Sequence, residues 1–168
     1  AKAFLLASLW RDATGPVVVV TPHPDDARRL VGQLQAYCGD DAPIYHFAES
    51  ELLPYERLSV EAGTVHERIA ALGALHGLTG PRGDPSGGAG FQPPIIVPSV
   101  TGLMQKTLPP ELLRGHARTI VPDQKMQVQS TLAHWSRRGY NSGTVVDEPG
   151  TAAGRGGIVE IYGPDHSR

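Results

Sequence analysis

The chain has 168 residues, of which 40% are hydrophobic and 19% are charged, a composition typical of a soluble globular protein. Its formal net charge of −2 excludes a protein whose overall field would attract nucleic acid. Cys38 is the only cysteine, so an internal disulfide is excluded and a reducing compartment, the cytoplasm, is expected. No stretch approaches the roughly 18 apolar residues of a membrane span and no signal peptide is visible, so we expect no contact with a membrane.

The first helix and the first strand are predicted from two apolar segments. Ala3–Arg11 has apolar residues at helical spacing, and they predict one apolar helix face made of Phe4, Leu5, Ala7, Ser8 and Leu9. The β-branched run Val17–Val20 predicts a strand that is buried on both faces of a parallel sheet.

Two further helices and a strand follow. Pro24 suits the first turn of a helix over Asp25–Tyr37, which Gly39 ends. Ile44–Phe47 predicts a short strand, and Val65–Leu78 predicts an amphipathic helix. The residues expected to face the core are Ala27, Leu30, Val31 and Leu34 in the earlier helix, and Val65, Ile69, Leu72 and Leu75 in the later one.

Two segments are expected to lack regular structure. Glu49–Val60 contains Pro54 and shows no periodic pattern. Gly77–Pro94 is more than half glycine and proline, and this composition predicts a flexible surface insertion.

The segment after the insertion is expected to join two domains. The apolar run Ile95–Val97 predicts a buried strand. Ser99 is a suitable N-cap for a helix over Val100–Leu108, and Pro109-Pro110 is expected to stop that helix and mark a domain boundary. The alternation of strands and helices up to this point predicts an α/β domain with a parallel sheet.

A smaller α+β unit is predicted beyond the two prolines. Asp123 is expected to cap a helix over Gln124–Arg138, with Met126, Leu132, Ala133 and Trp135 facing inward and Gly139 as the C-cap. The expected strands are Arg118–Val121, Gly143–Asp147 and Gly157–Tyr162, the last two joined by the turn-rich segment Glu148–Gly156.

One short motif indicates metal chemistry. The run Pro22-His23-Pro24-Asp25-Asp26 follows a predicted strand and resembles the zinc signature of the N-acetylglucosaminyl deacetylase (LmbE/PIG-L) family, in which His23 and Asp26 would bind zinc and Asp25 would be the general base. The sequence departs from that family at Ala27, where a Glu is usual, and it lacks the later His-x-x-His pair. The same residues also fit a helix that starts at Pro24, with two carboxylates favourably placed at the positive end of the helix dipole.

The N-terminal residues Ala1-Lys2-Ala3 raise the question of phosphate binding. A phosphate-binding loop ends in Gly-Lys followed by Ser or Thr, because the glycine admits the phosphate and the hydroxyl binds magnesium. Here only Lys2 matches, so either the loop is degenerate or Lys2 is an ordinary exposed lysine. We expect no ATP hydrolysis by this chain.

The order of several segments along the chain resembles one protein family. The segments are AKAFLLASLW, GPVVVVTPHPDDARRLVGQLQAY, ELLPYERLS, HERIAALGAL, IIVPSVTGLMQKTLPPELL and GYNSGTVVDEPGTAAGRGGIVEIYGP. Together they resemble the N-terminal part of bacterial transcription-repair coupling factor (Mfd), which is itself similar to the excision-repair helicase subunit UvrB. UvrB keeps an intact phosphate-binding loop and carries a long DNA-gripping hairpin between the segments that correspond to Leu53-Pro54-Tyr55 and His66–Leu75, and this chain has neither.

The resemblance implies two domains and a role in DNA repair. Residues 1–108 would form a degenerate helicase-like domain of the P-loop NTPase type without ATPase activity, and residues 109–168 would form a truncated domain similar to UvrB domain 2 that binds UvrA. The longer parent protein would recognise stalled RNA polymerase and displace it by ATP-driven translocation on double-stranded DNA, with ATP and magnesium bound outside this chain. We therefore expect a non-catalytic, monomeric adaptor region without a cofactor of its own.

The resemblance also implies where UvrA binds. The family uses arginines on the second domain, and Arg155 falls on one of these positions, with Gly156 beside it. Asn141 occupies a position where an arginine is common in coupling factors, and Arg138 at the preceding helix end is expected to compensate. Two other arginine positions of UvrB correspond to Ser142 and Ala153.

Two other classes of function compete with this adaptor role. One is the zinc-dependent deacetylase built around His23 and Asp26. The other is a module that binds damaged DNA, which the slightly acidic charge and the missing hairpin argue against.

Overall fold

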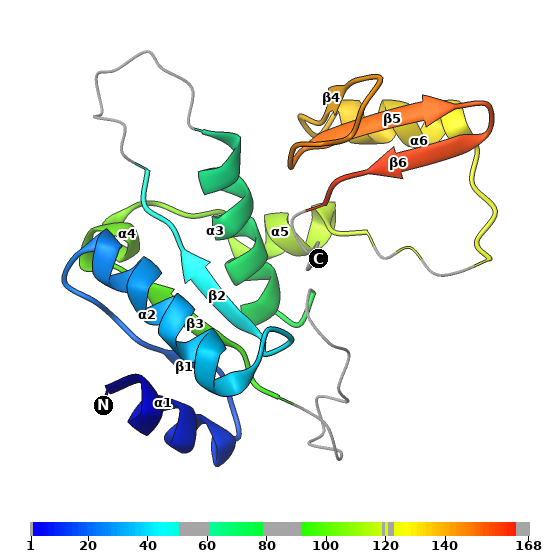
Figure 1. The fold of residues 1–168 in the computed structure, drawn as a ribbon. Coiled ribbons are helices and arrows are strands. Elements are labelled where there is room, and N and C mark those ends of the chain that lie inside the picture. The colour runs from blue at the N-terminus through cyan, green and yellow to red at the C-terminus, as the bar shows by residue number, and fades with distance from the viewer. Residues whose placement is uncertain (1, 51–60, 79–91, 119, 121–122, 164–168) are drawn as a thin grey trace.

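The computed structural model describes residues 2–50, 61–78, 92–118, 120 and 123–163. Figure 1 shows a parallel sheet between helices, followed by a smaller group of one helix and three short strands. We call the first group, α1–α4 with β1–β3, the sheet unit, and the second, α6 with β4–β6, the hairpin unit. Within the described ranges, no helix has the length and apolar character needed to cross a bilayer.

A three-stranded parallel sheet organises the sheet unit. Its strands are β1 (Val17–Val18), β2 (Ile44–Phe47) and β3 (Ile95–Pro98), in the order β1-β3-β2. Every residue of the central strand β3 is buried, which confirms the predicted buried strand. The sheet is parallel, as the alternation of strands and helices predicted.

The strand β1 departs from the prediction because it lies at an edge. Val17 and Val19 pack against the core and donate their N–H groups to Pro94 O and Ile96 O. Val18 and Val20 are about half exposed, at 50% and 49%. Burial on both faces was therefore wrong for β1, since only the face that carries Val17 and Val19 is covered by the core.

Helices α1 (Lys2–Arg11) and α2 (Pro24–Cys38) pack on one face of the sheet. Their core residues form a single cluster with the sheet, consisting of Ala3, Ala7, Trp10, Ala27, Leu34, Ile44, Ile95 and Val97. In α1 the predicted apolar face was largely wrong, because Phe4, Leu5 and Leu9 are mostly exposed. Besides Ala7, which was predicted, the helix buries Ala3 and Trp10.

Helix α3 (Ala62–Leu75) covers the opposite face of the sheet, where Phe47 and Ile96 lie. Its buried residues are Ala70, Ala71, Gly73 and Ala74. The larger residues predicted to point inward are half-buried or, for Val65, exposed. Like α1, this helix is apolar around most of its circumference, so spacing alone does not select the face with the smallest side chains.

The end of the predicted insertion belongs to the sheet unit. Pro93 and Pro94 are buried, and the indole N–H of Trp10 donates to Pro93 O at 2.6 Å. The prediction of a flexible insertion is therefore wrong at Pro93 and Pro94. Residues 79–91 of that insertion lie outside the described part of the chain. Residues 51–60 of the other segment predicted to be irregular lie outside it as well.

The helix after β3 is shorter than predicted. Ser99 caps α4 (Val100–Met104), because its hydroxyl oxygen accepts the N–H of Gly102 at 2.9 Å. The helix ends at Met104 rather than Leu108. The pair Pro109-Pro110 does not stop it but starts α5 (Pro110–His116), since a proline without an N–H suits the first turn of a helix.

The hairpin unit consists of α6 (Val128–Ser136) and a sheet in the order β4-β5-β6. The strands are β4 (Asn141–Ser142), β5 (Thr151–Arg155) and β6 (Ile158–Ile161). The hairpin between β5 and β6 turns at Gly156-Gly157, whose positive φ angles of 54° and 105° suit glycine. Gly154 lets α6 approach β5, because a Cβ there would lie 2.6 Å from Leu132 Cδ1.

Several expectations for this unit are corrected by the structure. Arg118 and Ile120 are not in a strand, and residues 119 and 121–122 of that predicted strand lie outside the described part. Helix α6 starts four residues later than predicted, Met126 precedes it, and Ala133 is exposed while Thr131 is buried. Asp123 is no N-cap, since that position is held by Gln127.

The strands of this unit are also redistributed relative to the prediction. The strand predicted over Gly143–Asp147 is not present there, and the nearest strand is the earlier β4. The segment Glu148–Gly156, predicted to be rich in turns, contains β5. The strand β6 is as predicted. Helix α6 ends at Ser136 with Arg137 as its C-cap, so the prediction of Gly139 as the C-cap was wrong, although Gly139 has a left-handed φ of 87°.

Candidate partner-binding site

Arg155 and Gly156 lie at the tip of the β5–β6 hairpin. Arg155 is the last residue of β5, pairs with Ile158 across the hairpin and is exposed. Its guanidinium Nη2 donates to the carbonyl oxygen of Thr144 in the segment that connects β4 to β5. Part of the hydrogen-bonding capacity of Arg155 is therefore used within the hairpin unit.

Asn141 and Arg138 lie at the other end of the same sheet. Asn141 is an exposed residue of β4 and pairs with Thr151, the first residue of β5. Arg138 follows α6 and donates from Nη1 to His134 O at 3.3 Å. Since Arg155 comes four positions after Thr151 in β5, these two pairs of predicted residues lie about 13 Å apart along the strand. The structure does not gather the four into one cluster.

The two remaining positions differ in exposure. Ser142 is exposed in β4. Ala153 is only 3% exposed, in the middle of the central strand β5. A long charged side chain would not fit at position 153 without displacing its neighbours.

A group of arginines that the sequence patterns did not connect lies at the carboxyl end of α6. Arg118, Arg137 and Arg138 are all exposed. Burial lowers the pKa of His134, and the positive charges of Arg138, Arg118 and Arg137 lower it further, in that order. The charges of three guanidinium groups therefore act on one imidazole. The sequence did not relate Arg118 to this helix end, because its segment was predicted as a strand.

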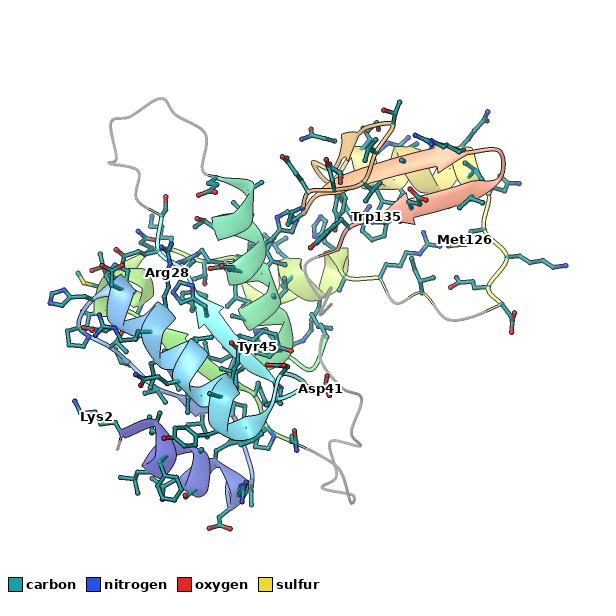
Figure 2. All side chains as sticks on the ribbon, viewed as in Figure 1. Lys2, Arg28, Asp41, Tyr45, Met126 and Trp135 are labelled. Carbon is teal, nitrogen blue, oxygen red and sulfur yellow. The ribbon has the colours of Figure 1, made fainter. Side chains whose placement is uncertain are left out.

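Aromatic rings border this group of arginines. The ring of Trp135 lies 4.9 Å from that of Tyr140 and 5.5 Å from that of His134, measured between centroids. In the described residues, Trp135 Nε1 and His134 Nε2 are buried without a hydrogen-bond partner. Figure 2 shows Trp135 on the hairpin unit.

Lys2 is the first residue of α1 and is exposed (Figure 2). Its neighbour Ala3 is buried in the core. No hydrogen bond or ion pair joins Lys2 to another described residue, so the degenerate loop stays a prediction.

The predicted zinc ligands are part of a helix start. His23 is the N-cap residue of α2, and Asp26 forms an exposed ion pair with Arg29, with 3.4 Å between Oδ1 and Nη1. Among the described residues, no three His, Cys, Asp or Glu side chains are grouped so as to hold a metal. The deacetylase alternative therefore finds no support in the structure, and the carboxylates act at the helix dipole instead.

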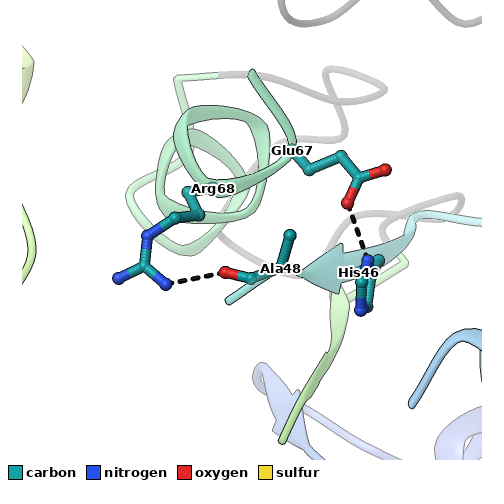
Figure 3. A network of polar contacts seen from close by, with 4 residues as sticks. All are labelled: His46, Ala48, Glu67 and Arg68. Carbon is teal, nitrogen blue, oxygen red and sulfur yellow. Dashed lines mark hydrogen bonds and ion pairs between the residues drawn. The ribbon is translucent and has the colours of Figure 1, made fainter. Parts of the chain in front are cut away.

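The carboxyl end of the sheet is occupied by side chains that bind one another. Arg68 Nη1 donates to Ala48 O at 2.7 Å (Figure 3). The guanidinium of Arg68 also lies over the ring of Phe47. Gln105 exchanges two hydrogen bonds of 2.8 Å with the backbone of Ser50. Burial lowers the pKa of Arg68. This end of the sheet is thus tied together by its own polar groups.

A cleft of about 430 Å³ lies beside β2, between α2, α3 and the hairpin unit. Its wall includes His46 and Glu67, whose Nδ1 and Oε2 atoms are 2.7 Å apart (Figure 3). His66 also lines it and lies against Gly150 of the hairpin unit. None of the predicted partner-binding residues lines this cleft.

Comparison with known proteins identifies relatives along nearly the whole chain. It is 28% identical over 169 residues to the transcription-repair coupling factor of Myxococcus xanthus and 30% identical over 165 residues to that of Mycobacterium tuberculosis (strain CDC 1551 / Oshkosh), with 98% of the chain covered in both. Identity to the Escherichia coli (strain K12) transcription-repair coupling factor is 26% over 162 residues, or 96% of the chain.

No family model matches the chain. The chain spans about 13% of the length of each of these relatives. The resemblance expected from the segment order is confirmed, and the chain is homologous to a region of the transcription-repair coupling factors.

Proposed function

We propose that this chain is the UvrB-like, N-terminal region of a transcription-repair coupling factor and that it recruits UvrA to lesions where RNA polymerase has stalled. The observation that supports the proposal is homology over 96–98% of the chain to proteins named as coupling factors. The mixed α/β architecture with a parallel sheet is compatible with the helicase-like domain that the resemblance implies.

In this proposal the longer parent protein is a cytoplasmic, ATP-dependent translocase on double-stranded DNA that displaces RNA polymerase. Its motor, with ATP and magnesium, and its polymerase-binding module lie outside this chain. The chain itself is a monomeric, non-catalytic adaptor without a cofactor.

Two features support a contact with UvrA through the hairpin unit. The exposed guanidinium of Arg155 stands at the tip of a hairpin, where a partner carboxylate can approach it and accept two hydrogen bonds. The neighbouring glycines leave the tip without bulky side chains.

A binding assay between this chain and purified UvrA tests the proposal. We expect the wild-type chain to bind at low salt and Arg155→Ala to bind more weakly, by about 2–5 kcal/mol if the contact is a buried charge pair. Arg155→Lys is the matched variant, because it keeps the charge and a donor for Thr144 O but loses the planar fork. Absence of binding by the wild-type chain would refute the recruitment role, and full binding by Arg155→Ala would refute the assignment of Arg155.

A further inference from the structure

We propose that helix α3 holds α5 and the hairpin unit through two histidine contacts that open when the imidazole rings are protonated. One contact joins His76 to Arg114 of α5, and the other joins His66 to Gly150 of the hairpin unit. We call them the two histidine contacts. This conformational device goes beyond the proposed function, because it concerns how the hairpin unit is held against the sheet unit and requires no partner.

The first contact lies at the carboxyl end of α3. Arg114 Nη2 donates to Nδ1 of His76, the C-cap residue, at 3.2 Å. A guanidinium has only donors, so this hydrogen bond exists only while Nδ1 of His76 keeps its lone pair. Protonation of His76 replaces the acceptor by a donor and places two positive charges side by side. The contact therefore changes from attraction to repulsion.

No described carboxylate offsets this repulsion. The ion pairs among the described residues involve neither His76 nor Arg114. The last turn of α3 carries no basic side chain, and the other titratable side chains of α5 are Glu111 and His116. Nδ1 of His116 donates to Leu112 O of its own helix at 2.7 Å, so this second imidazole does not contribute to the contact with α3.

The second contact lies near the start of α3. Nδ1 of His66 donates to the carbonyl oxygen of Ala62 at 2.7 Å, so Nε2 is unprotonated in the neutral ring. The ring lies against Gly150, where a Cβ would be 3.2 Å from Nε2. The backbone of Gly150 bonds to Asn141 of β4 and to Tyr162, which follows β6. His66 therefore touches the residue that ties the ends of these two strands together.

The cleft beside this contact does not neutralise a protonated His66. The other titratable side chains that line it are Tyr45 and His46 of β2, Glu67 of α3 and Tyr162. Glu67 already forms an ion pair with His46, toward which its carboxylate points (Figure 3). The lining residues of α2 in the described part of the chain are the uncharged Val31 and Gln35. Protonation of both imidazoles therefore leaves a net positive charge between the two units.

The two histidine contacts together fix the orientation of the hairpin unit. His66 and His76 are ten positions apart, which is about 15 Å along the axis of α3. Two separated points of attachment resist a rotation that a single point allows. Histidine is the side chain whose charge ordinarily changes between about pH 5 and 8. A fall in pH across this range therefore frees the hairpin unit, with Arg155 at its tip, to change its orientation.

Double electron–electron resonance between two nitroxide labels measures this orientation. The labelled chain carries Cys38→Ser, Gln33→Cys in α2 and Glu160→Cys in β6, and the two labelled positions are exposed. The test variant adds His66→Gln and His76→Gln, because glutamine stays uncharged and offers Arg114 an acceptor at every pH. The matched control adds His116→Gln, which removes an imidazole that binds only its own helix.

We expect the distance that dominates in the parent labelled chain at about pH 8 to be largely lost at about pH 5.5. The His66/His76 variant should keep that distance at both values, and the His116 variant should lose it as the parent does. Circular dichroism at both values separates opening from unfolding. The proposal is overturned if the parent distribution does not change with pH, if the His66/His76 variant still responds, if His116→Gln abolishes the response, or if helix content falls together with the distance.

Discussion

The guanidinium of Arg68 lies over the ring of Phe47, with 4.2 Å between Cζ and the ring centroid. Through this contact and its hydrogen bonds to Ala48 O and Gly102 O, one side chain of α3 joins the end of β2 to α4. The substitution Arg68→Met keeps much of the side-chain length but leaves these carbonyls without their donor. We expect a loss of about 2–3 kcal/mol in the free energy of unfolding, measured with urea. Arg68→Lys should lose less, and equal stability of Arg68→Met and wild type would contradict this role.

Ser99 begins α4 and also donates its hydroxyl to the carboxylate of Glu49. We expect Ser99→Ala to lower the free energy of unfolding by about 1–2 kcal/mol, since it removes the helix cap that accepts the Gly102 N–H and the hydrogen bond to Glu49. Ser8→Ala in α1 is the control, because its hydroxyl bonds only to the backbone of its own exposed helix face. The prediction fails if the two alanine variants unfold at the same urea concentration.

Gly150 and Gly32 should respond in opposite directions to alanine. Gly150 has a φ of 82°, and a Cβ there would lie 2.8 Å from Cε1 of His66. We expect Gly150→Ala to destabilise the protein by about 1–3 kcal/mol. Gly32 lies in the interior of α2 with open space around it, so Gly32→Ala should stabilise by about 0.4–1 kcal/mol. Thermal unfolding of both variants checks the pair, and a shift of the same sign in both would count against it.

His134 should titrate below its ordinary pKa of 6.5, because burial and the charges of Arg138, Arg118 and Arg137 disfavour the imidazolium. A histidine whose folded pKa is lowered binds its proton more readily in the unfolded chain. Its contribution to stability is therefore present above the unfolded pKa and declines as the pH falls through and below 6.5. We expect the NMR titration midpoint of His134 to move upward in Arg118→Gln with Arg137→Gln. A midpoint that does not move would show that the arginines lie too far away to act on the ring.

The chain alone should not hydrolyse ATP. Lys2 is the only residue that matches the end of a phosphate-binding loop, and the magnesium-binding hydroxyl is replaced by Ala3. We expect phosphate release at background level, unchanged in Lys2→Ala. Turnover above background that Lys2→Ala abolishes would overturn the expectation.

The sequence predicted strands well where both burial and residue type agree. The residues of β3 are β-branched or apolar and are buried on both faces, so the run was recognised and its place in the sheet is central. The valines of β1 look the same in sequence but lie at an edge, because strand order depends on contacts between distant segments. The strand β5 was missed, since Ala152, Ala153 and Gly154 have little preference for strands and are held there by pairing with β6.

Only part of the candidate site could be predicted from the sequence. The glycines beside Arg155 indicated a turn, and the structure places that arginine next to one. The charges that act on His134 come from Arg118 and from residues about 20 positions later in the chain, and no periodic pattern connects positions so far apart. The assignment of these residues to a partner stays a prediction.

The strand order β1-β3-β2 has a consequence for how the chain folds. The first two strands never touch each other and are joined only through β3, which is the last of the three to leave the ribosome. The bond from Trp10 to Pro93 likewise spans 83 positions. Until about residue 98 has been synthesised, β1 has no strand to pair with, and only the contacts of α1 with α2 and of β2 with α2 and α3 can form. Folding of this unit should therefore be a late and concerted event during synthesis, and its rate should be set by the closure of long loops.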